Sequence, residues 1–336
     1  MKYMDSDERK GKIKDIVRED ELAPVVLFTY NRLEHTKKTV EALQQNVLAA
    51  DTKLFIYSDA PKNEGAKDSV AAVREYLRSV TGFKKIEIIE REENWGLARN
   101  IIDGVTKIVN EYGRIIVLED DIVTSRYFLQ YMNDALRIYE SEPQVMAVSS
   151  YCWAKEKTNL PETFFLDWFN CWGWATWKDA WSKFERNPKN LIKYHNMKKD
   201  KHFNMNGTEN MWAQVEQNVS GKIYTWAIFF YSSIYINKGL VLFSNEDLSL
   251  NIGMDDSGEH CGNDELGIYK TVLKSVPVKN YSKEYFSNIN GEKNIEKTNL
   301  IKMDFYRLPN RILRVWENEG IVGIYLRLKR RIINYL

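Results

Sequence analysis

Between residues 23 and 150, the chain alternates short apolar runs with amphipathic segments, and this alternation constrains the fold more than any other feature. The apolar runs, such as VVLFTY and RIIVLED, are continuous, which is typical of strands buried on both faces of a parallel sheet. Apolar residues in the intervening segments recur at helical spacing. The pattern predicts an α/β fold with a mostly parallel, Rossmann-like sheet and covering helices. The expected strands span residues 25–30, 53–59, 85–90, 114–120 and 145–150, and the expected helices span residues 34–46, 70–80, 97–111 and 127–139.

Polar side chains follow three of these strands, and in doubly wound sheets ligands bind at this carboxyl edge. The residues are Thr29, Asn31, Arg32, Asp59, Glu119, Asp120 and Asp121. The three consecutive acids repel one another unless a cation lies among them. Carboxylate oxygens suit Mn²⁺ or Mg²⁺, and such an ion commonly also holds substrate phosphates. A solvated acidic loop, a surface arginine and a local turn at Asp59 are the plainer alternatives.

Composition argues against several classes of protein. The chain carries 48 basic and 47 acidic side chains, so no broad basic surface for nucleic acid is expected. Neither GxGxxG nor GxxxxGK[ST] occurs, which disfavours dinucleotide and P-loop sites. Three cysteines without metal-ligand spacing predict a reduced, cytoplasmic setting. Residues 1–22 are expected to form a charged lead-in without the apolar core of a signal peptide, and no apolar run reaches the ~18 residues of a membrane span.

The alternation of apolar runs and amphipathic segments ends after residue 150. This change predicts a first half at residues 23–150, a second half at 151–281 and a C-terminal segment at 282–336. FFLDWFNCWGWATWKDAW is rich in tryptophan, which suits either core packing or contacts with sugar faces. The glycine-rich stretch at residues 251–262 predicts a flexible loop. Basic and apolar residues alternate over 311–336, which predicts amphipathic helices that lie on an anionic membrane surface or dock on the protein itself.

Six segments, taken in order, resemble a known family. They are VVLFTYNRLEHTKKTVEAL, LFIYSDAPKNEG, NWGLARNIIDGV, IIVLEDDIVTSRYFLQYM, CWGWATWKDAW and NIGMDDSGEHCG. Over roughly residues 24–265, the chain resembles nucleotide-sugar glycosyltransferases of GT-A fold, and most closely the N-acetylglucosaminyltransferase I type and its bacterial relatives in surface-polysaccharide synthesis. The resemblance implies a GT-A sheet with a smaller acceptor-side lobe. It also implies a UDP-sugar donor and a glycan or lipid-linked glycan acceptor.

The resemblance further implies a role for individual residues. Asp121 would coordinate the metal bound to the donor diphosphate, Asp120 would meet the ribose, and Glu119 would meet the donor sugar. The remaining residues implied to bind the donor are Thr29, Asn31, Arg32, Asp59, Ser257 and His260, the last two on a loop that orders over the diphosphate. Trp172 and Trp174 are expected to line the acceptor cleft, while most other tryptophans of their cluster pack in the core.

The chain departs from the resembled pattern at the general base. In those families an Asp precedes the Trp of the segment that matches IYTWAIFF, but here Tyr224 and Thr225 precede Trp226. Glu209 and Glu216, on an expected helix, are the substitute candidates, although both also fit exposed helical acids. The expected activity is inverting transfer of a hexosyl or N-acetylhexosaminyl group. A non-catalytic nucleotide-sugar or glycan-binding protein stays open, as does a phosphohydrolase, which usually needs more acids and histidines.

Overall fold

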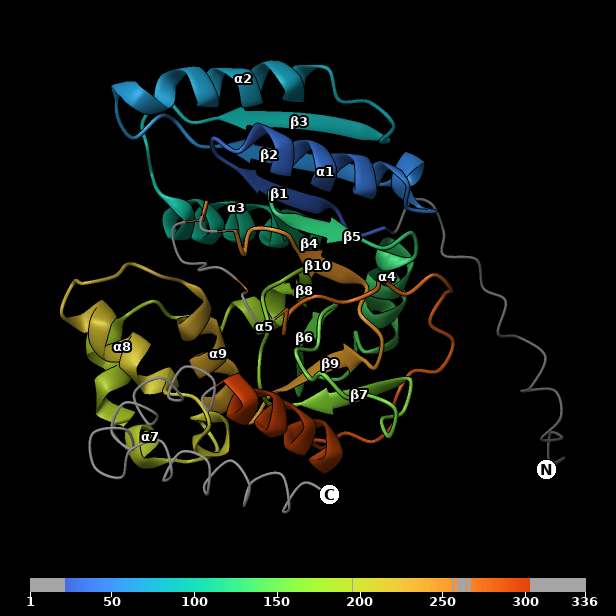
Figure 1. Ribbon diagram of the computed structural model, residues 1–336, viewed down its shortest axis with the longest axis vertical. Helices are drawn as coiled ribbons and strands as arrows, with labels where there is room; N and C mark the ends of the chain where they lie inside the picture. The colour runs from blue at the N-terminus through green and yellow to red at the C-terminus, as the bar shows by residue number, and fades with distance from the viewer. Residues whose placement is uncertain (1–21, 195, 256, 259–263, 265–266, 303–336) are drawn as a thin grey trace, which may run out of the picture.

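The computed structural model describes residues 22–302, apart from residues 195, 256, 259–263 and 265–266. An eight-stranded sheet runs through this part of the chain in the order β3-β2-β1-β4-β8-β6-β9-β7, from the top to the bottom of Figure 1. Within the sheet, β7 and β8 run antiparallel to their neighbours and the other strands share one direction. The expected α/β class with a mostly parallel sheet is confirmed.

Five strands lie where the alternation of apolar runs predicts them. They are β1 (Val25–Thr29), β2 (Lys53–Ser58), β3 (Lys85–Glu90), β4 (Arg114–Glu119) and β6 (Val145–Ser149). Three further strands complete the sheet, namely β7 (Thr163–Leu166), β8 (Trp174–Trp177) and β9 (Leu240–Ser244). A small second sheet pairs β5 (Ile122–Thr124) with β10 (Ser249–Asn251). The two expected halves therefore share one sheet, because β7, β8 and β9 follow residue 151.

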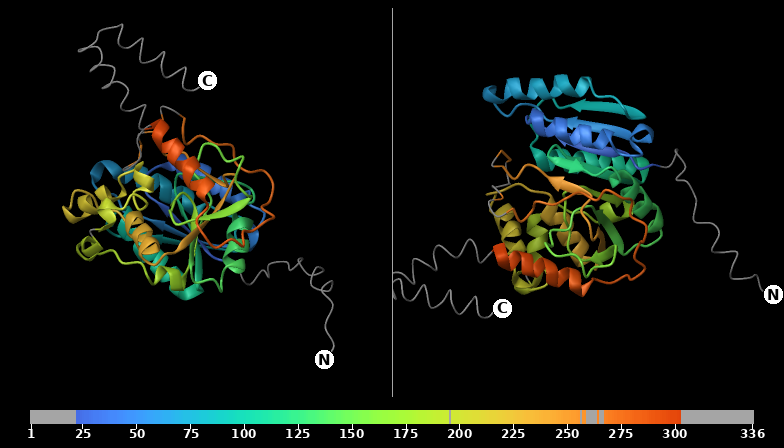
Figure 2. Two further views of the ribbon diagram at one scale, coloured as in Figure 1. Left: turned by 90° about the horizontal axis from the view of Figure 1, so that it is seen from below. Right: turned by 45° about the vertical axis from the view of Figure 1, so that its right-hand side comes forward.

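The four expected helices are also present. They are α1 (Leu33–Gln44), α2 (Lys67–Arg78), α3 (Leu97–Tyr112) and α4 (Phe128–Ile138). The later helices are shorter, namely α5 (Lys178–Trp181), α6 (Pro188–Leu191), α7 (Asn196–Lys199), α8 (Met211–Val219) and α9 (Ala227–Ile236). A helix over residues 289–302, orange-red in Figures 1 and 2, lies at the end of the molecule opposite α2. None of the described helices is long and apolar enough to cross a membrane.

The sheet separates two apolar cores, because successive residues of a strand point to opposite faces. In β1, Val25 and Leu27 belong to the core formed with α1, α2 and α4, whereas Val26 and Phe28 belong to the core formed with α3. All four side chains are buried. Burial on both faces explains why β1 is a continuous apolar run, and it confines the polar groups to the end of the strand.

Three sequence predictions lie outside the described residues. They are the lead-in, which the structure leaves out except for Leu22, the amphipathic segment at residues 311–336, and the donor contact at His260.

Candidate active site

The three acids follow the fourth strand in the structure, and the cation among them is a side chain of the protein itself. Glu119 is the last residue of β4, and Asp120 and Asp121 form the turn into β5. Nη2 of Arg32, the residue before α1, donates to Asp120 Oδ1 at 2.5 Å and to Asp121 Oδ2 at 2.7 Å. The parallel pairing of β1 with β4 brings Arg32 to these carboxylates. The positive partner that the sequence demanded is therefore in place.

Burial and neighbouring negative charge raise the pKa values of Glu119 and Asp120. Burial, followed by the charges of Asp121 and Asp120, raises the pKa of Glu119 to about 8. Burial likewise raises the pKa of Asp120 to about 6, although Arg32 opposes the shift. Burial works against the charged form of Arg32, but the two aspartates outweigh it and raise the guanidinium pKa. The protonated forms of Glu119 and Asp120 are thus favoured, while Arg32 beside them stays ionised.

A glycine holds a neighbouring segment against this cluster. Ile252, which follows β10, donates its backbone N–H to the carbonyl oxygen of Asp121 at 2.9 Å. At the next residue, Gly253, a Cβ atom would lie 2.2 Å from Asp121 Oδ2 and 2.9 Å from Arg32 Nη1. Only glycine leaves room for both side chains here. The sequence analysis missed this residue, although its place in the NIGMDD stretch was a usable signal.

Asp59 reaches the expected edge of the sheet but serves the protein's own backbone. Its carboxylate accepts from the N–H groups of Trp95, Gly96 and Ala60 at 2.8–2.9 Å, and from Asn94 Nδ2 at 3.1 Å. These bonds fix the loop that enters α3, and they correspond to the plainer interpretation of Asp59 as a turn residue. The carboxylate is therefore engaged within the protein and is a poor candidate for a contact with the nucleotide-sugar donor.

The other donor-side residues take varied positions. Thr29 ends β1 and is buried, with its hydroxyl 3.4 Å from the carbonyl oxygen of Tyr57, while Asn31 is half-buried beside Arg32. Ser257 is exposed and donates to Asp255 Oδ1 at 2.5 Å. Asp255 in turn lies 3.1 Å from Nε2 of His35 on α1. The predicted closing loop is thus tied to the first helix as well as to Asp121.

A cavity of about 710 Å³ opens beside the acids. Glu119 and Asp121 line it, together with Trp172, Glu209, Tyr224 and Lys302. Its walls come from the ends of β4 and β10, from the residues around α8 and α9, and from the helix at residues 289–302. Segments far apart in the sequence therefore meet at the carboxyl edge of β4, which is where the sheet topology predicts a ligand.

The structure separates the two candidate bases. Glu209 lies shortly before α8, lines the cavity, and has Lys302 Nζ 3.4 Å from Oε1. Glu216 lies on the exposed part of α8, pairs with Lys198 at 2.7 Å, and is not among the residues that line the cavity. Tyr224 also lines the cavity at a position where the resembled families carry an acid. Geometry therefore supports Glu209 as the candidate base and does not support Glu216.

Another cavity carboxylate is already engaged. Asp264 lines the cavity, but it accepts from the backbone N–H groups of Ile268 and Tyr269 at 2.8 and 2.9 Å. Glu209 has no comparable set of backbone donors among the described contacts, so its carboxylate is more accessible to a proton donor in the cavity.

The two tryptophans predicted to bind the acceptor also lie in different environments. Trp172 is half-buried, lines the cavity, and packs against Tyr151 and Tyr269 at ring-centroid distances of 4.9 and 5.3 Å. Trp174 begins β8, is 1% exposed, and stacks on Trp226 at 5.1 Å. Trp174 is a core residue because β8 lies inside the sheet, between β4 and β6. Trp172 alone of this pair can present an aromatic face to a sugar.

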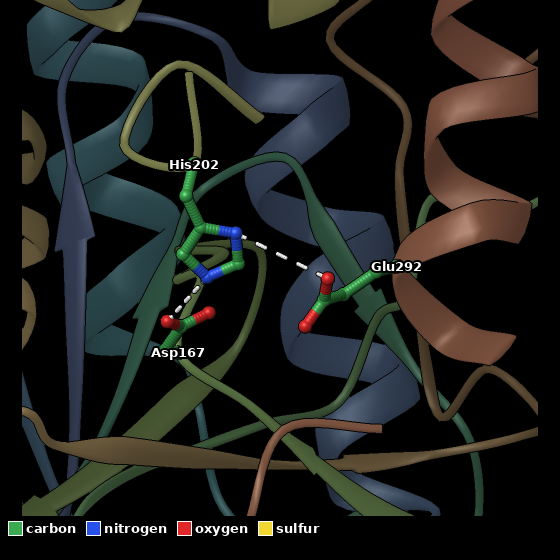
Figure 3. A group of neighbouring side chains, drawn as sticks. All are labelled: Asp167, His202 and Glu292. Atoms are coloured by element: carbon green, nitrogen blue, oxygen red, sulfur yellow. Dashed lines mark hydrogen bonds and ion pairs between the residues drawn. The ribbon is translucent and has the colours of Figure 1, made fainter. Parts of the chain in front are cut away.

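A second polar cluster lies at residues that the sequence analysis did not select, and Figure 3 shows its three members. The Nε2 atom of His202 is 2.6 Å from Asp167 Oδ2, and its Nδ1 atom is 4.0 Å from Glu292 Oε2 and 3.0 Å from Asn206 Oδ1. A metal ion shared by all three residues would have to be bound by one nitrogen of the His202 ring, and it would lie ~2 Å from each ligand atom. Instead, Asp167 and Glu292 face opposite nitrogens of the ring, and Asp167 is hydrogen-bonded directly to one of them. Asp167, His202 and Glu292 therefore form a hydrogen-bonded ion cluster rather than a metal centre.

The hydrogen bond that His202 donates to Asp167, reinforced by the one it donates to Asn206 Oδ1, raises the pKa of His202 to about 9 against partial burial. The imidazolium joins the end of β7 to the helix at residues 289–302, which carries Glu292. The same helix supplies Lys302 to the cavity, so this cluster supports one wall of the site.

Similarity to other solved structures is distant. The mannosyltransferase PcManGT from Pyrobaculum calidifontis, in complex with GDP-Man and Mn²⁺, has a TM-score of 0.37 and 14% identity, over 53% of this chain and 51% of its own. TarS from S. aureus has a TM-score of 0.39 and 9% identity, over 68% of this chain and 36% of its own. The protein thus spans about half of the first structure and about a third of the second. No curated protein sequence matches it significantly.

The family relationship rests on the sequence itself. The profile of the GNT-I family matches residues 5–204 of the 336 residues. The matched range holds β1 to β4, the three acids, Arg32 and Trp172. It confirms the family that the ordered segments resemble. The protein belongs to the GNT-I family.

Proposed function

We propose that this protein is a divalent-metal-dependent glycosyltransferase that moves a hexosyl or N-acetylhexosaminyl group from a UDP-sugar to a glycan acceptor. Membership of the GNT-I family supports glycosyl transfer as the class of reaction. The observation that carries the proposal is a shared cavity in which Glu119 and Asp121 meet a separate carboxylate, Glu209. Donor-side acids and a candidate base are thereby brought to one place.

The residues present fit a Mn²⁺ or Mg²⁺ ion at Asp121. The Asp121 carboxylate lines the cavity, and Gly253 places no side chain against Oδ2. Hard oxygen ligands are those that these ions prefer. When bound, the ion would stabilise the negative charge that develops on the departing diphosphate.

The protein's own residues would perform the remaining steps. Glu209 would accept the proton of the acceptor hydroxyl, whose oxygen then forms the new bond to the anomeric carbon. The bond from that carbon to the diphosphate oxygen breaks, and the electron pair leaves with the diphosphate. Glu119 would orient the donor sugar and Asp120 the ribose, while Trp172 would present its face to the acceptor. A base opposite the leaving group gives inversion at the anomeric carbon.

The proposed biological setting is the synthesis of bacterial surface polysaccharide or protein-linked glycan in the cytoplasm. A lipid-linked acceptor would place the protein peripherally on the membrane through residues 311–336, which lie outside the described residues. The second candidate function is a nucleotide-sugar or glycan-binding protein without turnover. It is favoured by Tyr224 and Thr225, which stand where the resembled families carry the base.

Calorimetry with UDP in the presence and absence of Mn²⁺ tests the proposal. We expect Mn²⁺-dependent UDP binding to wild-type protein and its loss in Asp121→Ala, because Asp121 would hold the ion on which diphosphate binding would depend. Asp68→Asn is the matched control, since Asp68 is an exposed acid on α2 outside the cavity. UDP binding that ignores both Mn²⁺ and Asp121 would overturn the metal site. Binding without turnover across a broad panel of donors and acceptors would favour the second candidate.

A further inference from the structure

Arg32 is paired with the carboxylate that is proposed to hold the metal ion. One nitrogen, Nη2, contacts both Asp120 and Asp121. The side chains of the two aspartates are each 7% exposed, and that of Arg32 is 17% exposed. Buried charges are stable when they are paired, so this contact satisfies acids that would otherwise repel one another. The donor-free site is held together by an internal cation.

The same contact opposes a divalent ion at Asp121. Asp121 Oδ2 already accepts a charge-assisted hydrogen bond from Arg32. A divalent ion on this carboxylate would lie close to the guanidinium, and like charges at such a separation repel strongly in a poorly solvated site. Without Arg32, the three acids would present one more unit of uncompensated negative charge to the ion.

Arg32 also has an unused donor. Its Nη1 atom is buried and has no hydrogen-bond partner among the described residues. It lies beside Gly253, where a Cβ atom would come within 2.9 Å of it. An unpaired buried N–H group is costly, and an anion next to it would relieve that cost. A diphosphate brought to Asp121 with its metal ion is an anion of the required kind.

We propose that Arg32 is an exchangeable counter-cation. It neutralises Asp120 and Asp121 in the donor-free protein, and it releases Asp121 to the metal ion when a nucleoside diphosphate offers its guanidinium a new anionic partner. The inference rests on the proposed metal site at Asp121. Its consequence is that metal alone binds weakly, and that metal and nucleotide bind together, because the two ligands share one internal competitor.

The test measures Mn²⁺ binding in the absence of nucleotide, with the electron paramagnetic resonance signal of free Mn²⁺ as the readout. We expect Arg32→Gln to bind Mn²⁺ at least about tenfold more tightly than wild type, a difference of ~1.4 kcal/mol. Arg32→Lys, which keeps the positive charge, is the matched control and should resemble wild type. Asp121→Asn in the Arg32→Gln background should abolish the gain. In the presence of Mn²⁺, Arg32→Gln should bind UDP more weakly, a change opposite in sign to the gain in metal affinity.

The possible results separate the inference from the function on which it rests. Equal or weaker Mn²⁺ binding by Arg32→Gln, with Asp121-dependent Mn²⁺–UDP binding intact in wild type, overturns the counter-cation and leaves the metal site standing. If neither wild type nor any variant shows Asp121-dependent Mn²⁺ binding, with or without UDP, both the counter-cation and the metal site are overturned. If Arg32→Gln does not fold, a wild-type structure with Mg²⁺ and UDP decides. Arg32 Nη2 should then have left Asp121 Oδ2, and a retained contact beside the bound ion overturns the inference.

Discussion

At the scale of single residues, the proposed role of Glu209 as the base is what separates the enzyme from the alternative of a binding protein. It is the glutamate of the two candidates that lines the cavity beside Asp121, whereas Glu216 faces Lys198 outside it. A carboxylate in this position can accept the proton of an acceptor hydroxyl, while a carboxamide of the same shape cannot. The proposed base, Glu209, therefore lies seven positions before Glu216, the candidate that does not line the cavity.

We expect Glu209→Gln to lower kcat/KM by ~10²–10⁴-fold, the usual range for loss of a general base. UDP binding in the presence of Mn²⁺ should stay unchanged, because Glu209 is not expected to contact the donor diphosphate. Glu216→Gln is the matched control and should retain wild-type kinetics. Steady-state rates with saturating donor would measure both, and a Glu209→Gln enzyme with normal turnover would exclude this residue as the base.

The sequence predicted which polar residues lie together where backbone position alone decides, and it was incomplete where burial decides. The triple acid and Arg32 were found because residues at the carboxyl ends of neighbouring parallel strands must lie close together. Trp172 and Trp174 could not be told apart, since nothing local shows that a strand inside the sheet begins at Trp174. Lys302 carried no signal, because its place in the cavity depends on how a distant helix docks.

At the scale of elements, the start of β8 depends on Gly173. Its φ of +79° is strained for other residues, and a Cβ atom would lie 2.6 Å from Ser150 Oγ and 3.2 Å from Phe128 Cε2. Close approach here seats β8 between β4 and β6 and leaves Trp172 at the cavity. Backbone conformation and packing therefore require glycine at the same residue.

We expect Gly173→Ala to lower the free energy of unfolding by ~2–4 kcal/mol, the sum of backbone strain and overpacking. Gly221→Ala separates the two contributions, because Gly221 has a φ of +72° but a Cβ atom there would meet no described atom within 4 Å. That control should lose only ~1–2 kcal/mol. Urea unfolding measures both, and equal losses would mean that the contact with Ser150 is easily relieved.

The helix at residues 289–302 is attached through an ion cluster whose contribution depends on pH. The pKa of His202 is about 9 in the folded protein, above its ordinary value of 6.5. Stability from this group is therefore complete below the ordinary value and is lost as the pH rises through about 9. Deprotonation weakens the link between Asp167 and Glu292.

We expect the wild-type free energy of unfolding to fall more steeply between these two pKa values than that of His202→Gln. Asp167→Asn should flatten the same slope, because it removes the carboxylate that raises the His202 pKa most. Urea unfolding at a series of pH values would show this. Parallel profiles for wild type and His202→Gln would contradict the role of the imidazolium.

At the scale of the whole molecule, one sheet carries both sides of the proposed reaction. The acids and Arg32 come from the part built by β1 to β4, and Trp172 and Glu209 come from the part that follows β6. Since β8 joins β4 to β6, the two sides are not free to move as separate domains within the sheet. Donor binding is thus not expected to move the two halves of the sheet relative to one another.

The sequence by itself determined the α/β class, the positions of the first five major strands along the chain, the family and the acidic strand end. These follow from local periodicity and from the rule that parallel strands place their carboxyl ends together. Only the tertiary structure decided which glutamate and which tryptophan face the cavity, and that Arg32 is the cation among the acids. Those outcomes depend on burial and on contacts between distant residues, such as Arg32 and Asp121, which are 89 positions apart in the chain, and no local pattern encodes them.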